Sequence, residues 1–271
     1  SVGDGDVVDL VGANGVGKST VLRAITGETK PTGGTISIDG RIGVMRQFIG
    51  TGADPARDVR SLLLSLSPDR IQDAARRLAL AQVDVERDPM RYAEALAAWG
   101  DAGGYDIEVQ WDEACGRALA GDLDDVADRP LATLSGGEQK RLALEFLLRG
   151  ENEILVLDEP DNYLDVPAKR WLETELQSTR KSVLFVSHDR ELLAASATKI
   201  VTIEAAGAWT HGGGFATYAD AKAAHAAKRA HDASLYDDER KRLEELVAEM
   251  RRRAKMSDVF APKLKAAESR L

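Results

Sequence analysis

Residues 12–20 form a glycine-rich loop of the kind that binds phosphate groups. Their sequence, Gly-Ala-Asn-Gly-Val-Gly-Lys-Ser-Thr, fits the pattern Gly-x4-Gly-Lys-Ser, in which main-chain N–H groups face phosphate oxygens. Lys18 can neutralise charge between the β- and γ-phosphates, and Ser19 can give a hydroxyl to Mg²⁺. The loop therefore predicts a site for a nucleoside triphosphate. Its expected contacts are Asn14, Gly15, Val16, Gly17, Lys18, Ser19 and Thr20.

Two carboxylates, Asp158 and Glu159, directly follow the apolar run of residues 154–157. We expect Asp158 to hold Mg²⁺ and Glu159 to polarise the water that attacks the γ-phosphate. A strand that simply ends in solvated acids is the alternative. The presence of the phosphate loop favours the catalytic interpretation.

Gln47 and His188 are expected at the same site because each ends or follows a predicted strand. Gln47 is predicted to touch the metal or the attacking water, and His188 to hydrogen-bond the γ-phosphate and Glu159. The other histidines lack such a context, and no pair has the spacing of a metal site. The single cysteine, Cys115, excludes a disulfide framework and fits a reducing cytoplasm.

The elements that must position these residues alternate between strands and helices. This alternation predicts an α/β fold with a largely parallel sheet. Residues 35–40 alternate between polar and apolar types, and residues 41–47 are predicted to pair with them as an antiparallel β hairpin. The strands are expected at residues 7–11, 154–157 and 183–186, with helices at 19–26, 138–148 and 169–177.

Two other segments differ from these strands and helices in their predicted structure and composition. Residues 48–133 read as short helices and predict an inserted helical subdomain. Residues 211–271 follow a glycine cluster, and a long helix is expected at 218–255 with a returning leg near its end. The chain has a net charge of −9, yet residues 222–271 hold 13 Lys and Arg against 9 Asp and Glu. This asymmetry indicates either a local contact with a polyanion or an ordinary solvated helix.

The composition suits a packed, water-exposed domain rather than a membrane protein. Apolar residues make up 44% of the chain and charged residues 30%. No apolar run approaches the roughly 20 residues that span a bilayer. We therefore expect a cytoplasmic protein without membrane contact.

The segment 134–141, Leu-Ser-Gly-Gly-Glu-Gln-Lys-Arg, beside both phosphate motifs resembles the signature of ATP-binding cassette (ABC) ATPases. The resemblance covers residues 2–210 and implies a P-loop fold that binds ATP and Mg²⁺. It also implies that the signature binds the γ-phosphate held by an opposite cassette, with Asp165 at the seam between the two. The signature residues are Ser135, Gly136, Gly137 and Glu138.

The segment 158–165, Asp-Glu-Pro-Asp-Asn-Tyr-Leu-Asp, is similar to that of subfamily F, although Asp161 and Tyr163 depart from its usual Thr and His. In this subfamily a charged helical hairpin joins two cassettes and reaches the ribosome near the peptidyl-tRNA. The resemblance implies that residues 211–271 begin such a linker and that its basic residues contact ribosomal RNA or tRNA. These residues are Arg251, Arg252, Arg253 and Lys255.

Three functions remain open on the sequence. The first is an ATPase cassette of a ribosome-binding protein that regulates translation or protects against antibiotics. The second is the ATPase subunit of an ABC transporter, and the third is a nucleotide-gated module without catalysis. For the first, the resemblance implies that full activity needs a facing cassette, supplied by the same full-length chain or by a second copy. The sequence before Ser1 and the second cassette would then belong to a longer protein.

Overall fold

The computed structural model describes residues 2–47, 58–205, 207–254 and 265. The chain divides into two compact units, Ser1–Ala216 and Thr217–Leu271. The strands are β1 (Val7–Gly12), β2 (Ile42–Met45), β3 (Ile154–Asp158), β4 (Ser182–Val186), β5 (Lys199–Glu204) and β6 (Gly207–His211). The helices are α1 (Lys18–Ile25), α2 (Val59–Leu66), α3 (Asp69–Val83), α4 (Pro89–Asp101), α5 (Gly104–Leu119), α6 (Leu123–Val126), the 3₁₀ turn η1 (Leu131–Thr133), α7 (Gly136–Arg149), α8 (Val166–Ser178), α9 (Arg190–Ser196) and α10 (Phe215–Ala254).

The first unit is built on a six-stranded sheet in the order β2-β3-β4-β1-β5-β6. All neighbouring pairs are parallel except β5 with β6, which confirms the predicted α/β fold with a parallel core. Because β1, β3 and β4 are parallel neighbours, their carboxyl ends meet at one edge of the sheet. The phosphate loop follows β1, Asp158 and Glu159 stand at the end of β3, and His188 follows β4.

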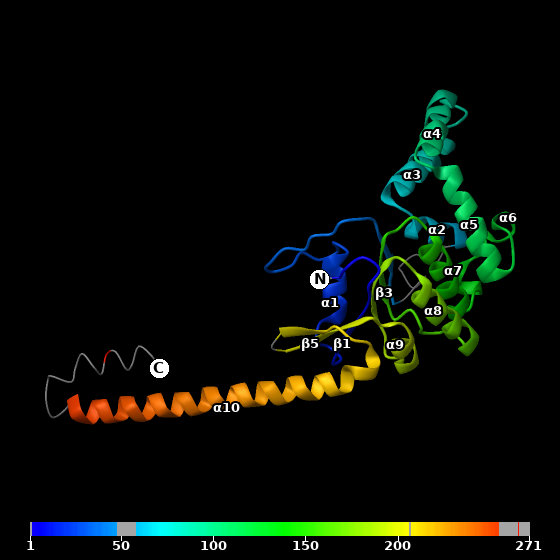
Figure 1. The fold of residues 1–271 in the computed structure, drawn as a ribbon. Coiled ribbons are helices and arrows are strands. Elements are labelled where there is room, and N and C mark those ends of the chain that lie inside the picture. Colours follow the sequence, from blue (N-terminus) through cyan, green and yellow to red (C-terminus); the bar gives the residue numbers. More distant parts are fainter. Residues whose placement is uncertain (1, 48–57, 206, 255–264, 266–271) are drawn as a thin grey trace. The chain divides into compact units, whose positions relative to one another are not determined.

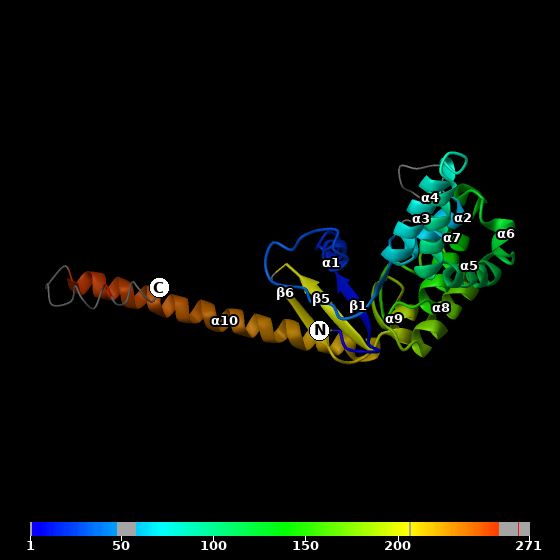
Figure 2. The ribbon, with the colours of Figure 1, turned by 90° about the horizontal axis from the view of Figure 1, so that it is seen from above.

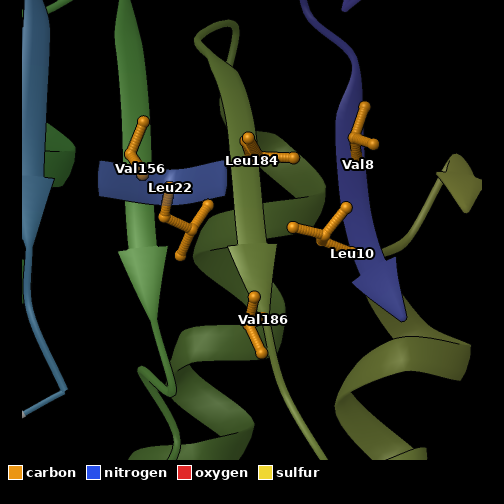
Figure 3. Packing of buried hydrophobic residues seen from close by; sticks show 6 residues of the cluster. All are labelled: Val8, Leu10, Leu22, Val156, Leu184 and Val186. Atoms are coloured by element: carbon orange, nitrogen blue, oxygen red, sulfur yellow. The ribbon is translucent and has the colours of Figure 1, made fainter. Parts of the chain in front are cut away.

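One buried hydrophobic cluster lies between this sheet and α1. Val8, Leu10, Val156 and Leu184 extend from the three central strands toward Leu22 of α1, and all five are nearly fully buried. Figure 3 shows these side chains on one face of the sheet. Helices α7 and α8 lie on the opposite side from α1 in Figures 1 and 2. The phosphate loop is therefore anchored by a buried strand before it and a buried helix face after it.

The predicted antiparallel hairpin of residues 35–40 with 41–47 is wrong. Residues 35–40 have no regular secondary structure, and β2 pairs in parallel with β3 instead. The alternating pattern of 35–40 depended on Ile36 and Ile38, and both are about two-fifths exposed. A two-stranded hairpin that buries no apolar face is at best marginally stable. Within the described residues, antiparallel pairing between strands is confined to β5 and β6.

Helices α2 to α6 and η1 occupy residues 59–133, so the described part of the expected helical insert is helical. Asp58 caps α2 through a reciprocal pair of hydrogen bonds with Ser61. Trp111 of α5 is buried, and its Nε1 donates to Ser67 Oγ at the end of α2, 3.2 Å away. Cys115, one helical turn after this tryptophan in α5, is fully buried, and burial raises the pKa of its thiol to about 11. The thiol is therefore inert.

The described part of the second unit is helix α10 from Thr217 onward, together with Lys265. Helix α10 runs unbroken for 40 residues from Phe215 to Ala254. The returning leg of the predicted helical hairpin lies outside the described residues, apart from Lys265. Among the helices described, none combines the length and the apolar character needed to cross a bilayer.

Asp9 is a buried carboxylate in the middle of β1. Its neighbours Val8 and Leu10 point into the core, so Asp9 points to the opposite face of the sheet. Neither carboxylate oxygen has a hydrogen-bond partner of normal geometry. Burial raises the pKa of Asp9 to about 7, and the nearby main chain at Ser187 and Leu10 offsets only part of this shift.

Replacing Asp9 by Asn is expected to stabilise the chain more at pH 8 than at pH 5. The ordinary pKa of an Asp carboxyl is 3.8. Since the folded-state pKa is raised, the stability due to the bound proton is fully present below pH 3.8 and is lost as the pH rises to about 7. A pKa shift of this size corresponds to about 4 kcal/mol in the free energy of unfolding, of which about 3 kcal/mol falls between pH 5 and pH 8. Urea titrations of both proteins at the two pH values measure the difference.

Asp6→Asn is the matched control, because Asp6 accepts a hydrogen bond from Lys199 that lowers its pKa below the ordinary value. Asp6 therefore keeps its charge at both pH values, and its loss should destabilise the chain by the same amount at each. An Asp9→Asn effect that does not change between pH 5 and pH 8 would contradict the assignment of a buried proton to Asp9.

Candidate functional site

The glycine-rich loop joins β1 to α1 and has the backbone of an anion cradle. Gly15 and Gly17 have φ of 77° and 110°, in the left-handed region that glycine adopts without strain. Gly17 is the N-cap of α1, and no side chain caps the first N–H groups of that helix. Those N–H groups, with the positive end of the helix dipole, can bind a negatively charged ligand.

Lys18 lies folded over this loop. Its Nζ donates to the carbonyl oxygen of Gly12 at 2.8 Å and to that of Ala13 at 3.3 Å. Asn14, Ser19 and Thr20 are exposed around it. The loop thus brings an ammonium group, free main-chain donors and a hydroxyl to one place, which is the donor set that a polyphosphate requires.

The three predicted metal residues, Ser19, Gln47 and Asp158, line one cavity of about 230 Å³ between α1, β2 and β3. The pKa of Asp158 is raised, mainly by burial and then by the negative charge of Glu159, while Lys140 acts in the opposite direction. A hydroxyl, an amide oxygen and a carboxylate are hard oxygen donors. This set fits Mg²⁺, whose charge would also offset the burial of Asp158.

Glu159 is the point on which the predicted catalytic side chains converge. The Nε2 group of Gln47 donates to Glu159 Oε2 at 2.7 Å, and the Nδ2 group of Asn162 donates to the same oxygen. His188 Nε2 lies 3.9 Å from Glu159 Oε1. Three segments far apart in sequence thus meet at one carboxylate, which directly follows Asp158. A carboxylate held in this way can orient and deprotonate a water molecule.

The backbone of Glu159 is unusual, because its φ is 50°. A residue with a Cβ adopts this left-handed conformation at a cost on the order of 1–2 kcal/mol. The main-chain N–H of Glu159 donates to the Val186 carbonyl oxygen at 2.9 Å, which ties it to the end of β4. The conformation is therefore maintained by neighbouring contacts rather than by local preference.

The signature residues form the start of α7. Ser135 is its N-cap and accepts from the Glu138 N–H at 3.2 Å, while the Glu138 carboxylate accepts from the Ser135 N–H at 2.7 Å. This capping box lowers the pKa of Glu138. Ser135 and Gly136 are exposed, so this helix start is accessible from outside the chain.

Tyr163 packs against both signature glycines, a contact that sequence reasoning missed. A Cβ on Gly136 would lie 3.1 Å from the Tyr163 ring, and one on Gly137 would lie 2.8 Å from the Tyr163 carbonyl oxygen. Tyr163 also has a positive φ of 68°. Asp165, predicted at a seam between cassettes, is the N-cap of α8 and accepts from the Ala168 N–H at 2.9 Å.

Lys140 is a second residue that sequence reasoning missed. It is 2% exposed, and its Nζ donates to the carbonyl oxygen of Glu159 at 3.0 Å. Burial lowers the pKa of Lys140 to about 8, while the carboxylates of Asp158, Asp161 and Glu159 act in the opposite direction. The sequence could have indicated its burial, because Lys140 stands one helical turn before Leu144 on the buried face of α7.

The predicted RNA contacts belong to the second unit. Arg251 and Arg252 are exposed near the end of α10. Arg253 belongs to the same helix, but its side chain and all of Lys255 lie outside the described residues. The described helix therefore carries two of the four predicted contacts on its surface.

Comparisons with known proteins show the family to which the chain belongs. Residues 1–162 match the family described as ABC transporter. The chain is 48% identical, over its whole length and 50% of the relative, to an antibiotic resistance protein of Mycobacteroides abscessus. It is 33% identical, over 93% of the chain and 44% of the relative, to the energy-dependent translational throttle protein EttA of Mycobacterium tuberculosis.

The chain thus spans about half the length of the curated relatives that it matches. Among solved structures, an inward-facing ABC transporter of the metal-chelate type superposes with a TM-score of 0.54 and 21% identity, over 78% of this chain and 73% of that one. This structural likeness concerns the fold and is independent of the sequence matches.

Proposed function

Because the chain belongs to the ABC family, within its subfamily F, we propose that it is the ATP-binding and ATP-hydrolysing cassette of a ribosome-binding protein. That protein regulates translation or confers antibiotic resistance by protecting the ribosome. We assign this activity to the cytoplasm. The names of the relatives support both versions, since one is a translational throttle and the other an antibiotic resistance protein.

The observation that carries the proposal of ATP hydrolysis is the convergence on Glu159. Gln47, Asn162 and His188 approach its carboxylate from three segments, next to Asp158 and the phosphate loop. In our proposal Glu159 takes the proton of the attacking water, and His188 and Gln47 orient the γ-phosphate and that water. Residues 14–20 hold the phosphates through main-chain N–H groups and Lys18.

Mg²⁺ is the cofactor that fits the cavity lined by Ser19, Gln47 and Asp158. In our proposal these three residues hold the ion. When bound, Mg²⁺ neutralises negative charge on the β- and γ-phosphates. The cluster offers a hydroxyl, an amide and a carboxylate, which matches the preference of Mg²⁺ for oxygen donors.

We further propose that full activity needs a facing cassette. Ser135, Gly136, Gly137 and Glu138 would bind the γ-phosphate of that cassette's ATP, and Asp165 would lie at the seam. The exposed start of α7 supports this arrangement, because nothing in its own capping box covers Ser135 or Gly136. The partner is the second cassette of the same full-length protein or a second copy of this chain.

Residues 211–271 are proposed as the beginning of the charged linker between cassettes. Arg251, Arg252, Arg253 and Lys255 would contact phosphates of ribosomal RNA or tRNA, with an affinity that falls as salt rises. The exposure of Arg251 and Arg252 on a long helix supports this part of the proposal.

The proposal predicts that full-length protein sediments with ribosomes in the presence of a non-hydrolysable ATP analogue. Arg251→Glu with Arg252→Glu should weaken this association about tenfold or more, and should reduce its dependence on salt. The matched control, Lys222→Glu with Lys228→Glu, changes the charge of α10 equally but nearer its start. Sedimentation assays in a salt series measure both variants.

The alternative function, the ATPase subunit of an ABC transporter, predicts that the protein is recovered with membranes instead of ribosomes. Recovery of the protein with membrane vesicles and not with ribosomes would favour that function and reject ours. Equal weakening by the two pairs of charge changes would instead reject the assignment of the RNA contact to the end of α10.

A further inference from the structure

Lys140 places a buried positive charge directly behind the proposed catalytic carboxylate. Its side chain leaves α7 and its Nζ donates to three main-chain carbonyl oxygens, those of Glu159 at 3.0 Å, Arg46 at 3.4 Å and Asp158 at 3.5 Å. Burial of an ammonium group is unfavourable unless dipoles or charges compensate it. The three carbonyl dipoles and the surrounding acids provide that compensation.

The three carbonyl oxygens belong to the segments that handle the attacking water. Arg46 immediately precedes Gln47, and Asp158 and Glu159 are the proposed metal ligand and general base. A single side chain therefore fixes the main chain on both sides of the hydrogen bond between Gln47 and Glu159, which is 2.7 Å long.

The hydrogen bond from Lys140 to the Glu159 carbonyl oxygen can maintain the strained backbone of Glu159. With a φ of 50°, the residue needs contacts on both of its peptide groups to remain left-handed. Val186 accepts from its N–H, and Lys140 donates to its carbonyl oxygen. Loss of the second contact would leave one peptide group free to rotate and would change the direction of the Glu159 side chain.

We propose that Lys140 is a positioning residue, which holds Glu159 in its left-handed conformation and so aims the carboxylate at the attacking water. The proposal rests on the proposed ATP hydrolysis and adds a residue to it that touches neither the nucleotide nor the water. It differs from a purely structural role, because it predicts an effect on catalysis that is separate from any effect on folding.

The test uses full-length protein with Lys140→Met, which keeps the long apolar stem and removes the donor. We expect kcat for ATP hydrolysis to fall about tenfold or more, with the KM and the affinity for ATP within about twofold of wild type. Lys140→Gln, whose N–H donor is one bond shorter, should recover part of the loss. It also serves as the second variant if the Met protein does not fold.

Glu145→Gln is the matched control. Glu145 is 1% exposed on the same helix and binds Arg141 and Arg149, yet it has no contact with Glu159. Its replacement should lower the midpoint of thermal unfolding and leave kcat within about twofold. If Lys140→Met behaves in the same way, Lys140 is structural and the proposal is overturned. A fall in ATP affinity parallel to kcat would overturn it as well.

Hydrogen exchange separates this proposal from the proposed function. Lys140→Met should speed the exchange of the Glu159 amide, which is bonded to Val186, whereas Glu145→Gln should not. Wild-type protein without ATP turnover would reject the proposed function alone. Unchanged exchange at Glu159 would reject the role of Lys140, whatever the turnover.

Discussion

Replacing Glu159 by Gln should reduce ATP turnover by about 10²- to 10⁴-fold, the range that general base catalysis contributes. The amide cannot take a proton from water, but its oxygen can still accept from Gln47 and Asn162. ATP should bind as tightly as before or more tightly, because the variant removes a negative charge close to the γ-phosphate. Phosphate release and equilibrium binding of ATP, measured with the full-length protein, test both expectations.

Glu191→Gln is the control for this change. Glu191 is an exposed carboxylate in the first turn of α9, and its loss should leave turnover unchanged. Turnover in Glu159→Gln within about tenfold of wild type would show that another group activates the water. A loss of ATP binding in the same variant would indicate that Glu159 serves the fold of the site instead.

Gly137→Ala is expected to abolish most turnover while leaving ATP binding at the chain's own phosphate loop intact. The new Cβ would lie 2.8 Å from the Tyr163 carbonyl oxygen, a main-chain atom that cannot rotate away. The start of α7 or the segment of Tyr163 must therefore shift, and a displacement near 1 Å at a catalytic group costs about 10²-fold in rate. The phosphate loop belongs to a different segment, between β1 and α1, so nucleotide affinity is the internal reference.

Gly116→Ala provides the matched comparison. Gly116 is an exposed residue of helix α5, and a Cβ there would meet no atom within 4 Å. Alanine should raise the free energy of unfolding by up to about 1 kcal/mol, because it is the better helix former, and should leave turnover unchanged. If Gly137→Ala retained the turnover of Gly116→Ala, the signature loop would have no part in hydrolysis.

Much of the fold and the main parts of the site follow from local sequence patterns. Residues 154–157 and 183–186 are continuous apolar runs, and residues 7–11 are apolar except for Asp9. Such runs are typical of strands in a parallel sheet that is covered on both faces. The order of these runs and the helices between them determines a parallel sheet. Once these strands are parallel, the motifs that follow them must share one edge, so Glu159 and His188 could be grouped from the sequence. Gln47 was expected at the same site, but its strand was predicted in an antiparallel hairpin and is the parallel strand β2.

Other features depend on contacts between distant segments, which a local pattern does not record. The role of Lys140 requires the register of α7 against β3, and the conformation of Glu159 requires Val186 at the end of β4. The pattern of Ile36 and Ile38 suggested a hairpin, but alternation specifies a strand only where one face is buried. Asp9 reads as a break in an apolar strand, and its raised pKa follows from the closed environment around it.

Helix α7 links the two surfaces that are proposed to bind nucleotide. Its N-cap is Ser135, the proposed contact for a facing cassette, and Lys140 lies about 7.5 Å further along its axis, where it donates to the main chain of the proposed general base Glu159. A partner that displaces the start of α7 would therefore also displace Lys140. In the proposed pair of cassettes, hydrolysis of one ATP would then depend on the state of the other.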